Sequence, residues 1–161
     1  MNAQQTKQKG FTIIEVVLVL AIAGLIFLMV FIALPALQRN QRDTARKNDA
    51  SAIASAVTAF TGNNRGKKPT AAQIVQYASN LSENIKRGDD GTIAVDAITV
   101  ETPTSFPASA APEDSIAAVT YGSACDTIDT TKATLKKGTA RQLTVVLKLE
   151  SGNGSYYCLD S

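Results

Sequence analysis

The sequence lacks several residue types on which enzymes and metal sites commonly depend. It contains no histidine, no tryptophan and only two cysteines among its 161 residues. Histidine is the usual general base near neutral pH and the commonest metal ligand, and two distant cysteines do not make a Cys-x-x-Cys site. The sequence therefore predicts a protein that is not an enzyme, uses no cofactor and holds no metal ion.

Charge is also scarce, and along one stretch it is missing altogether. Charged residues make up 19% of the chain, and the net charge of +2 implies no polyanionic partner. Residues 16–37 carry no charge at all. Because a membrane-spanning helix needs roughly 20 apolar residues, we expect residues 11–37 to be a transmembrane helix, followed by one head domain.

Glu15 lies close to the start of this apolar run, where an ionised carboxylate costs at least about 2.5 kcal/mol. It needs a partner. Gly10 would offer a protease an unhindered backbone, and cleavage after it would free an α-amine at Phe11, a positive charge within the apolar region. Phe11 and Glu15 are one helical turn apart, and the amine of one subunit can equally reach Glu15 of the next. The alternative is a carboxylate that merely lies in the headgroup layer.

Residues 9–15 have the sequence KGFTIIE, and the apolar run follows directly. This N-terminus resembles that of type IV pilins and pseudopilins, whose class III signal peptide is cut by a prepilin peptidase before the apolar run. The resemblance covers roughly the first 30 residues. It implies that residues 1–10 are a leader, that Gly10 is the cleavage position, that Phe11 is the N-methylated terminus, and that Glu15 guides assembly.

Gly24 and Pro35 are the positions at which the apolar helix is easiest to bend or unwind. Glycine costs about 1 kcal/mol against alanine in a helix, and proline removes a backbone donor. The resemblance implies that Gly24 is the helix-weakening glycine of pilins, although Pro35 lies further from it than the corresponding proline often does. The alternative is that a membrane helix simply tolerates both residues.

The remaining chain predicts an α+β head. Apolar residues at helical spacing continue the long helix over residues 38–62, so that its second half would pack on the head domain of residues 63–161. A second apolar stripe predicts a helix over about residues 70–87, with Thr70 as its N-cap. Alternating residues predict a small antiparallel sheet over about residues 92–160, including a C-terminal hairpin.

Cys125 and Cys158 both belong to the head. In an exported domain such a pair indicates a disulfide, which would resemble the C-terminal loop closure of many pilins, whereas in a cytosolic protein the two would be free thiols. Basic residues lie on both sides of the apolar run, so the positive-inside rule alone points the wrong way. The position of the head and its cysteines instead predicts a single-pass protein of the cytoplasmic membrane with its N-terminus inside.

Two further sets of charged residues are candidates for binding sites. A group of carboxylates resembles no calcium loop and is expected to be solvated. A set of basic residues would suit DNA or an anionic surface, although a mixed solvated surface is the simpler interpretation. The carboxylates are Asp126, Asp129, Glu150 and Asp160, and the basic residues are Arg65, Lys67, Lys68, Lys136, Lys137 and Arg141.

The sequence as a whole thus favours the subunit of a type IV pilus, and a major pilin in particular. Its partners would be identical or related pilin subunits, a prepilin peptidase, and the assembly platform with its ATPase, and the assembled filament would be extracellular. It would serve adhesion, motility or DNA uptake. The alternatives are a pseudopilin of a type II secretion or competence system, and a membrane-anchored binding domain.

Overall fold

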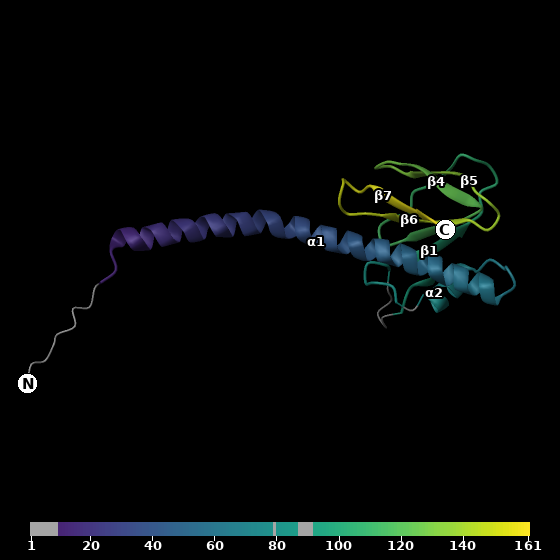
Figure 1. The fold of residues 1–161 in the computed structure, drawn as a ribbon, viewed down its shortest axis with the longest axis horizontal. Coiled ribbons are helices and arrows are strands. Elements are labelled where there is room, and N and C mark those ends of the chain that lie inside the picture. The colour runs from purple at the N-terminus through teal and green to yellow at the C-terminus, as the bar shows by residue number, and fades with distance from the viewer. Residues whose placement is uncertain (1–9, 79, 87–91) are drawn as a thin grey trace, which may run out of the picture. The chain divides into compact units, whose positions relative to one another are not determined.

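The computed structural model describes residues 10–78, 80–86 and 92–161, and the side chain of Val95 is left undescribed. The chain divides into two units, Met1–Leu37 and Gln38–Ser161. The second unit is the head, and Figure 1 labels several of its helices and strands.

Helix α1 (Ile13–Asn63) belongs to both units and contains 51 residues. Within the head, Ile53, Val57 and Phe60 recur at helical spacing, and all three side chains are buried. The helix ends where Arg65 and Gly66 take positive φ angles of 55° and 82°. Left-handed residues at this point turn the chain away from the helix axis, as glycine does at many helix ends.

Helix α2 (Ala71–Tyr77) is shorter than the sequence predicts. Its start agrees with the expected N-cap, because the backbone N–H of Thr70 donates to Oε1 of Gln73 at 2.9 Å, half of a capping box. The prediction that the helix continues to about residue 87 is wrong, since residues 80–86 form turns and irregular backbone. Residue 87 itself lies outside the described residues.

Ser82 supplies the physical reason for this early end. In a helix its N–H would donate to the carbonyl four residues earlier, but here the N–H and Oγ of Ser82 donate to the Asp49 carboxylate at 2.6 and 2.5 Å. The apolar stripe is nevertheless buried, because Leu81 and Ile85 remain in the core. The spacing of Leu81 and Ile85 therefore correctly predicted that both are buried, but wrongly predicted that they lie on a helix.

The strands form two sheets in place of the single antiparallel sheet that the sequence predicts. A short 3₁₀ helix, Val95–Ala97, leads into the first strand. The four-stranded sheet has the order β1-β3-β6-β7, and the three-stranded sheet has the order β2-β5-β4. The strands are β1 (Ile98–Glu101), β2 (Ala108–Ala110), β3 (Ala117–Tyr121), β4 (Ser123–Ile128), β5 (Ala133–Lys137), β6 (Leu143–Lys148) and β7 (Tyr156–Asp160).

Strand pairing is antiparallel except between β1 and β3, which run parallel. The α+β class, with a long helix packed on a small sheet dominated by antiparallel pairs, is confirmed. Strand β2 lies in a segment rich in proline, serine and threonine, residues 101–114, for which the sequence predicts a surface loop, and no pattern in the sequence predicts β5. Strands β6 and β7 form the expected C-terminal hairpin.

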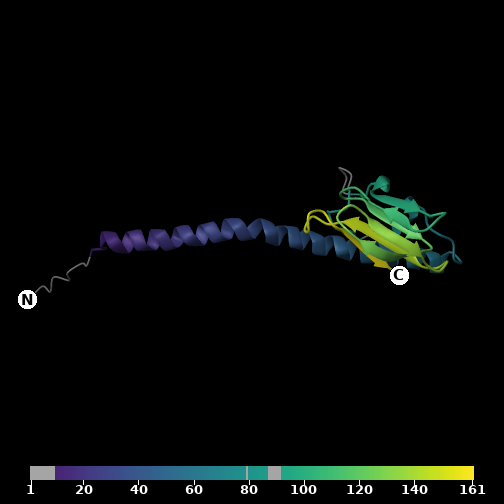
Figure 2. The same cartoon turned by 90° about the horizontal axis from the view of Figure 1, so that it is seen from above.

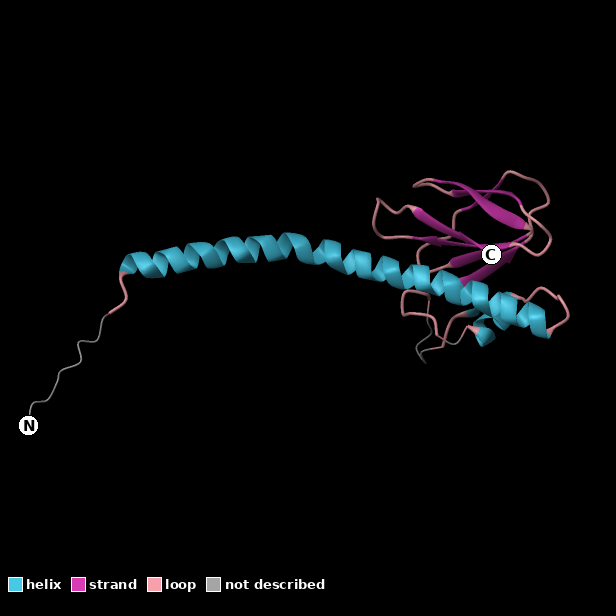
Figure 3. Cartoon of the chain, viewed as in Figure 1, coloured by secondary structure: helices cyan, strands magenta, loops and turns pink. Residues whose placement is uncertain are grey.

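The head has three layers because both faces of the four-stranded sheet are covered. Alternate side chains of β3 point to opposite faces, and all five are buried. Ala117 and Val119 pack with Ile53 and Ile74 of the helices, whereas Ala118 packs with Leu135 of the three-stranded sheet. Figures 2 and 3 show the strands layered beside the second half of α1.

Candidate functional site

The residues that the sequence singles out for processing and assembly lie just before α1 and in its first turn. Gly10, Phe11 and Thr12 precede the helix and have no regular backbone structure. The Gly10–Phe11 bond is therefore presented as exposed, non-helical chain, and the Phe11 side chain is 89% exposed. The predicted leader, residues 1–10, lies outside the described residues except for Gly10.

Glu15 is held by a capping box at the start of α1. Its Oε2 accepts hydrogen bonds from the backbone N–H of Thr12 at 3.1 Å and from the Thr12 hydroxyl at 2.9 Å. The Glu15 N–H donates in return to the Thr12 hydroxyl at 3.4 Å. This reciprocal pattern satisfies two backbone donors that a helix start leaves open.

Sequence reasoning missed Thr12, although the Thr-x-x-Glu pattern of residues 12–15 is a known signal for a capping box. In the uncleaved chain, the carboxylate of Glu15 is therefore hydrogen-bonded to Thr12. The pairing of Glu15 with a free amine at Phe11 stays a prediction, because that amine exists only after cleavage.

The described helix of the first unit, residues 13–37, presents an exposed apolar surface. From Phe11 to Leu37 the large apolar side chains are exposed, including Phe27 at 65% and Phe31 at 74%. A hollow of about 420 Å³ lies between Phe11, Glu15 and the next two turns, where Val16, Val19 and Leu20 line it. By length and composition α1 can cross a membrane. The carboxylate of Glu15 thus borders an apolar surface that needs a non-aqueous partner.

Comparison with protein families identifies this segment. Residues 5–31 carry the prokaryotic N-terminal methylation motif. The motif is the class III signal of type IV pilins and pseudopilins, and it implies processing by a prepilin peptidase and anchoring in the membrane before assembly. Neither the curated proteins nor the solved structures include a match to this chain. The motif therefore characterises the N-terminal segment, and the head must be interpreted from its own residues.

Gly24 and Pro35 both lie inside α1, which is helical through each of them. A Cβ atom built on Gly24 would meet no neighbouring atom within 4 Å. Glycine is therefore not required there by packing within the chain. The role of the two residues in bending or unwinding the helix stays a prediction.

Cys125 and Cys158 form a disulfide, with their Cα atoms 6.1 Å apart. Cys125 lies on β4, and Cys158 lies on β7. The bond therefore joins the three-stranded sheet to the last strand of the four-stranded sheet. It cross-links the two sheets as well as fixing the C-terminal strand.

A row of polar side chains docks α1 on the head. Asp43, Arg46 and Asp49 recur at every third position on one face of the helix, and all three are buried. Asp43 accepts hydrogen bonds from the backbone N–H groups of Glu150 and Ser151 at 2.7 and 2.9 Å. Arg46 donates to the carbonyl of Lys148 at 2.6 Å and to Glu150 at 2.9 Å. Sequence analysis did not identify this row, because charged residues on a helix normally indicate a solvated face.

The electrostatics of this row favour the charged carboxylate. Burial alone would raise the pKa of Asp43, but the hydrogen bonds from Ser151 and Glu150, together with the nearby Arg46, hold that pKa below its usual value. The Glu150 carboxylate also forms an ion pair with the Arg42 guanidinium, with 2.7 Å between nitrogen and oxygen. Two of the basic residues that follow the apolar run, Arg42 and Arg46, thus form ion pairs within the head.

The other sequence-derived candidates are mostly dispersed. Glu150 is engaged by arginines, and Asp129 accepts hydrogen bonds within its own turn from Thr131 and Lys132, which lower the pKa of Asp129. Within residues 10–78, 80–86 and 92–161, no three His, Cys, Asp or Glu side chains are grouped to hold a metal ion. Of the basic set, Lys136 lies 3.9 Å from Asp126. Arg65, Lys68 and Arg141, in contrast, line one hollow at the end of the head.

Proposed function

We propose that this chain is a structural subunit, a major pilin, that polymerises through α1 into a type IV pilus. The observation that carries the proposal is the combination of the methylation motif with an apolar helix whose large side chains are exposed throughout residues 11–37. A surface of that kind is stable only in a membrane or against other copies of itself. The head, in contrast, has a complete core of its own.

Glu15 would change its partner during maturation. Before cleavage, Thr12 satisfies its carboxylate. Cleavage after Gly10 would create a positive amine at Phe11, one helical turn from Glu15, and a charged partner attracts a carboxylate more strongly than a hydroxyl does in an apolar environment. Pairing between the amine of one subunit and Glu15 of its neighbour would set the stagger of the subunits.

The membrane holds the subunit before assembly. We place the N-terminus in the cytoplasm and the head on the outer side, with the apolar helix as the single span. Burial of these helices against one another would favour the filament, and Gly24 and Pro35 would allow the helices to adjust. The partners are identical or related subunits, a prepilin peptidase, and an assembly platform with its ATPase, and the filament would be extracellular.

A pseudopilin is the second candidate, because the same motif starts the subunits of secretion and DNA-uptake systems. The Cys125–Cys158 disulfide supports a pilin, since subunits of long extracellular filaments benefit from a cross-linked head. Long surface filaments made of this chain would support the pilin assignment, and short periplasmic assemblies would favour the pseudopilin.

Substitution of Glu15 tests the assembly role. Glu15→Gln keeps an oxygen that can accept the Thr12 hydrogen bonds but removes the charge, and Glu15→Ala removes both. We expect both variants to lower the filament yield by a factor of roughly 10 or more, as for the loss of a buried ion pair. Glu83→Gln, on the exposed surface of the head, is the matched control and should leave the yield unchanged.

The yield is measured by sedimentation of sheared filaments and by electron microscopy, with membrane levels of each variant as the reference. Normal filaments from Glu15→Ala would contradict an assembly role for this carboxylate. A defect in Glu15→Ala alone would show that capping by Glu15, and not its charge, is what assembly requires.

A further inference from the structure

The turn between β6 and β7 contains the one asparagine of the sequence that is followed by glycine, Asn153-Gly154. The N–H of Leu149 donates to the carbonyl of Ser155 at 2.8 Å, which closes the turn around this pair. Asn153 and Gly154 have φ angles of 60° and 80°, and left-handed pairs of this kind are an ordinary way to reverse a hairpin. The dipeptide therefore has a structural role, whatever its reactivity.

The Asn153 side chain is exposed, and hydrogen bonds do not hold it in place. Within residues 10–78, 80–86 and 92–161, neither its carboxamide nor the backbone N–H of Gly154 forms a hydrogen bond. Gly154 has no side chain, so nothing on that residue hinders the approach of its backbone nitrogen to Cγ of Asn153. The nitrogen and the carboxamide carbon can therefore meet without breaking a native contact.

The other asparagines that the structure describes lack this combination. The carboxamide nitrogen of Asn64 donates to the Phe60 carbonyl at 2.8 Å. That of Asn84 donates to the Ser82 hydroxyl at 3.0 Å. Asn80 is followed by a leucine whose side chain is buried. The remaining ones lie within α1, where helical hydrogen bonds engage the backbone: Asn40, Asn48 and Asn63.

We propose that Asn153 is a site of spontaneous deamidation, through attack of the Gly154 backbone nitrogen on Cγ of Asn153. The nitrogen loses its proton to hydroxide, a bond forms between it and Cγ, and the bond between Cγ and Nδ2 breaks. Nδ2 takes up a proton and leaves as ammonia, which gives a succinimide ring. Water then opens the ring at either of its carbonyl groups, to aspartate or to isoaspartate. The overall change consumes one water and releases one ammonia, with neither oxidation nor reduction.

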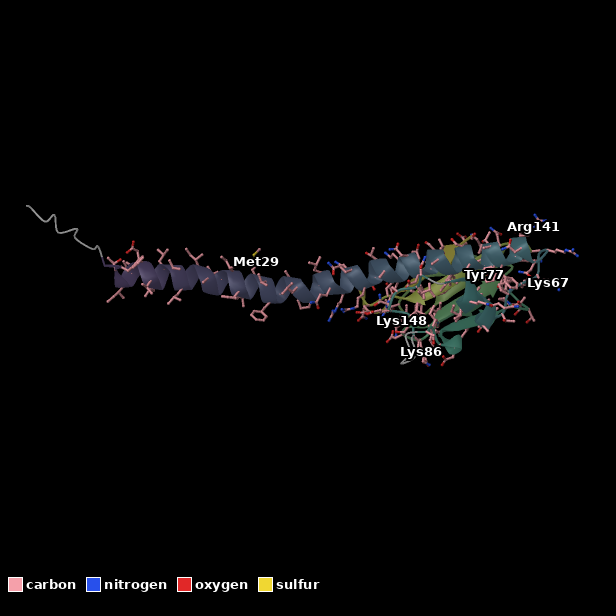
Figure 4. The ribbon with its side chains drawn as sticks, turned by 90° about the horizontal axis from the view of Figure 1, so that it is seen from below. Met29, Lys67, Tyr77, Lys86, Arg141 and Lys148 are labelled. Carbon is pink, nitrogen blue, oxygen red and sulfur yellow. A yellow bond between two sulfur atoms is a disulfide. The ribbon has the colours of Figure 1, made fainter. Side chains whose placement is uncertain are left out.

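Both products carry a new carboxylate at a hollow of about 510 Å³ that Asn153 helps to line. Figure 4 shows Lys148, another of its lining residues, toward the end of the head opposite Lys67 and Arg141. Deamidation therefore adds one negative charge at this end of the head. Isoaspartate would also add one carbon atom to the main chain of the turn.

Arg39 gives the new carboxylate a counter-ion. It lines the same hollow, and within the described residues it forms no ion pair. Among the native carboxylates of the hollow, Glu150 already pairs with Arg42. Asp114 pairs with Lys148 at 3.2 Å. Because the added charge faces solvent and has a cation nearby, the head should stay folded after the reaction.

The reaction needs neither cleavage nor assembly, so the full-length chain in nonionic detergent can be aged at neutral and at mildly alkaline pH. Peptide mapping by tandem mass spectrometry follows every asparagine over time. We expect position 153 to react first, to a mixture of aspartate and isoaspartate, and faster at alkaline pH because the attacking nitrogen must lose a proton. A synthetic peptide of residues 150–157 is the reference. The folded chain should react within about tenfold of its rate, because the turn is exposed.

Four variants locate the reaction. Asn153→Gln would need a larger ring and should stay unmodified at this position. Gly154→Ala adds a Cβ that meets Cε of Lys148 at 3.3 Å, and its restricted backbone should slow the reaction by roughly tenfold. Ser155→Ala changes a neighbour that takes no part in ring closure, so its rate should equal that of the parent. Asn153→Asp carries the charge of the product and should co-elute with the aged parent on ion exchange.

Gly154→Ala is strained at a φ of 80°, so the unfolding midpoint of each variant is measured first. If Gly154→Ala fails to fold, Asn153→Gln still shows whether the charge change arises at this position. An intact residue 153 in the aged parent, or a rate more than about tenfold below that of the peptide, would overturn the proposal. Equal conversion at Asn64 or Asn84, or the same charge change in Asn153→Gln, would also overturn it.

Discussion

The two halves of α1 belong to one helix but differ in how far their side chains are buried and hydrogen-bonded within the chain. In residues 13–37 the apolar side chains are exposed, and the polar side chain of Glu15 is satisfied within its own turn. In residues 38–63 the apolar side chains of Ile53 and Val57 are buried, and Asp43, Arg46 and Asp49 all reach partners outside the helix. The side chains of the second half therefore pack within the single chain, whereas the apolar side chains of the first half remain exposed.

This difference indicates where each half obtains its stability. The second half depends on intramolecular packing, so substitutions there should change the stability of the head. Among the described residues, the large apolar side chains of the first half are exposed, so substitutions there should have their effect in the membrane or in an assembly. Changes to the two halves can therefore be compared directly through the stability of the head and the yield of filaments.

Loss of the disulfide should produce the largest change in head stability. The bond closes a loop with a sequence separation of 33, so replacing Cys125 and Cys158 by serine should lower the free energy of unfolding by about 3 to 4 kcal/mol. Urea unfolding of the full chain in nonionic detergent, followed by circular dichroism, measures this. Reduction of the parent protein should have a matching effect. An unchanged midpoint would show that the two sheets hold together without the cross-link.

A pair of isoleucines compares the two halves of α1 with the same substitution. Ile53 is 0% exposed, whereas Ile32 is 72% exposed. Ile53→Ala should destabilise the head by about 3 kcal/mol through lost burial and the cavity that remains. Ile32→Ala should change head stability by less than about 0.5 kcal/mol. Equal effects on the unfolding midpoint would contradict the division of the helix into a half that packs on the head and a half that does not.

Asp43 gives a smaller effect that depends on pH. Asp43→Ala should lower stability at pH 7 by about 2 kcal/mol, because the N–H groups of Glu150 and Ser151 lose their acceptor. The folded-state pKa of Asp43 lies below its ordinary value of 3.8, so its charge stabilises the head above about pH 4. That contribution is lost as the pH falls through the folded-state pKa.

The variant and the parent should therefore converge in stability on acidification below about pH 4. Asp160→Asn, on an exposed side chain of β7, is the control and should follow the parent protein across the pH range. A gap between Asp43→Ala and the parent that stayed constant down to the lowest pH would mean that the carboxylate acts through packing alone.

Local sequence patterns predicted the parts of the fold that local patterns determine. The apolar run, the continuation of the helix as far as Asn63 and the C-terminal hairpin all follow from spacing and turn residues. The end of α2 does not, because it depends on Asp49, a residue far away in the sequence that takes the N–H of Ser82. The spacing of Leu81 and Ile85 indicated only that they would be buried.

Strand pairing and the functional details show the same limit. Short segments such as Ala108–Ala110 have too little alternation to predict a strand, and no local pattern states that β1 pairs in parallel with β3. Glu15 was found because a charge in an apolar run is conspicuous, whereas Thr12 was missed despite its capping pattern. Arg65 and Arg141 line one hollow at the end of the head, and only the tertiary fold brings these two residues to it.

The N-terminus of the mature protein tests the central claim most directly. Intact-mass and tandem mass spectrometry of the protein from sheared surface filaments would identify its first residue and any modification. The proposed function predicts a chain that begins at Phe11, carries one added methyl group on its amine and lacks residues 1–10. A filament or membrane protein that still begins at Met1 would contradict cleavage after Gly10, and with it the pairing of a new Phe11 amine with Glu15.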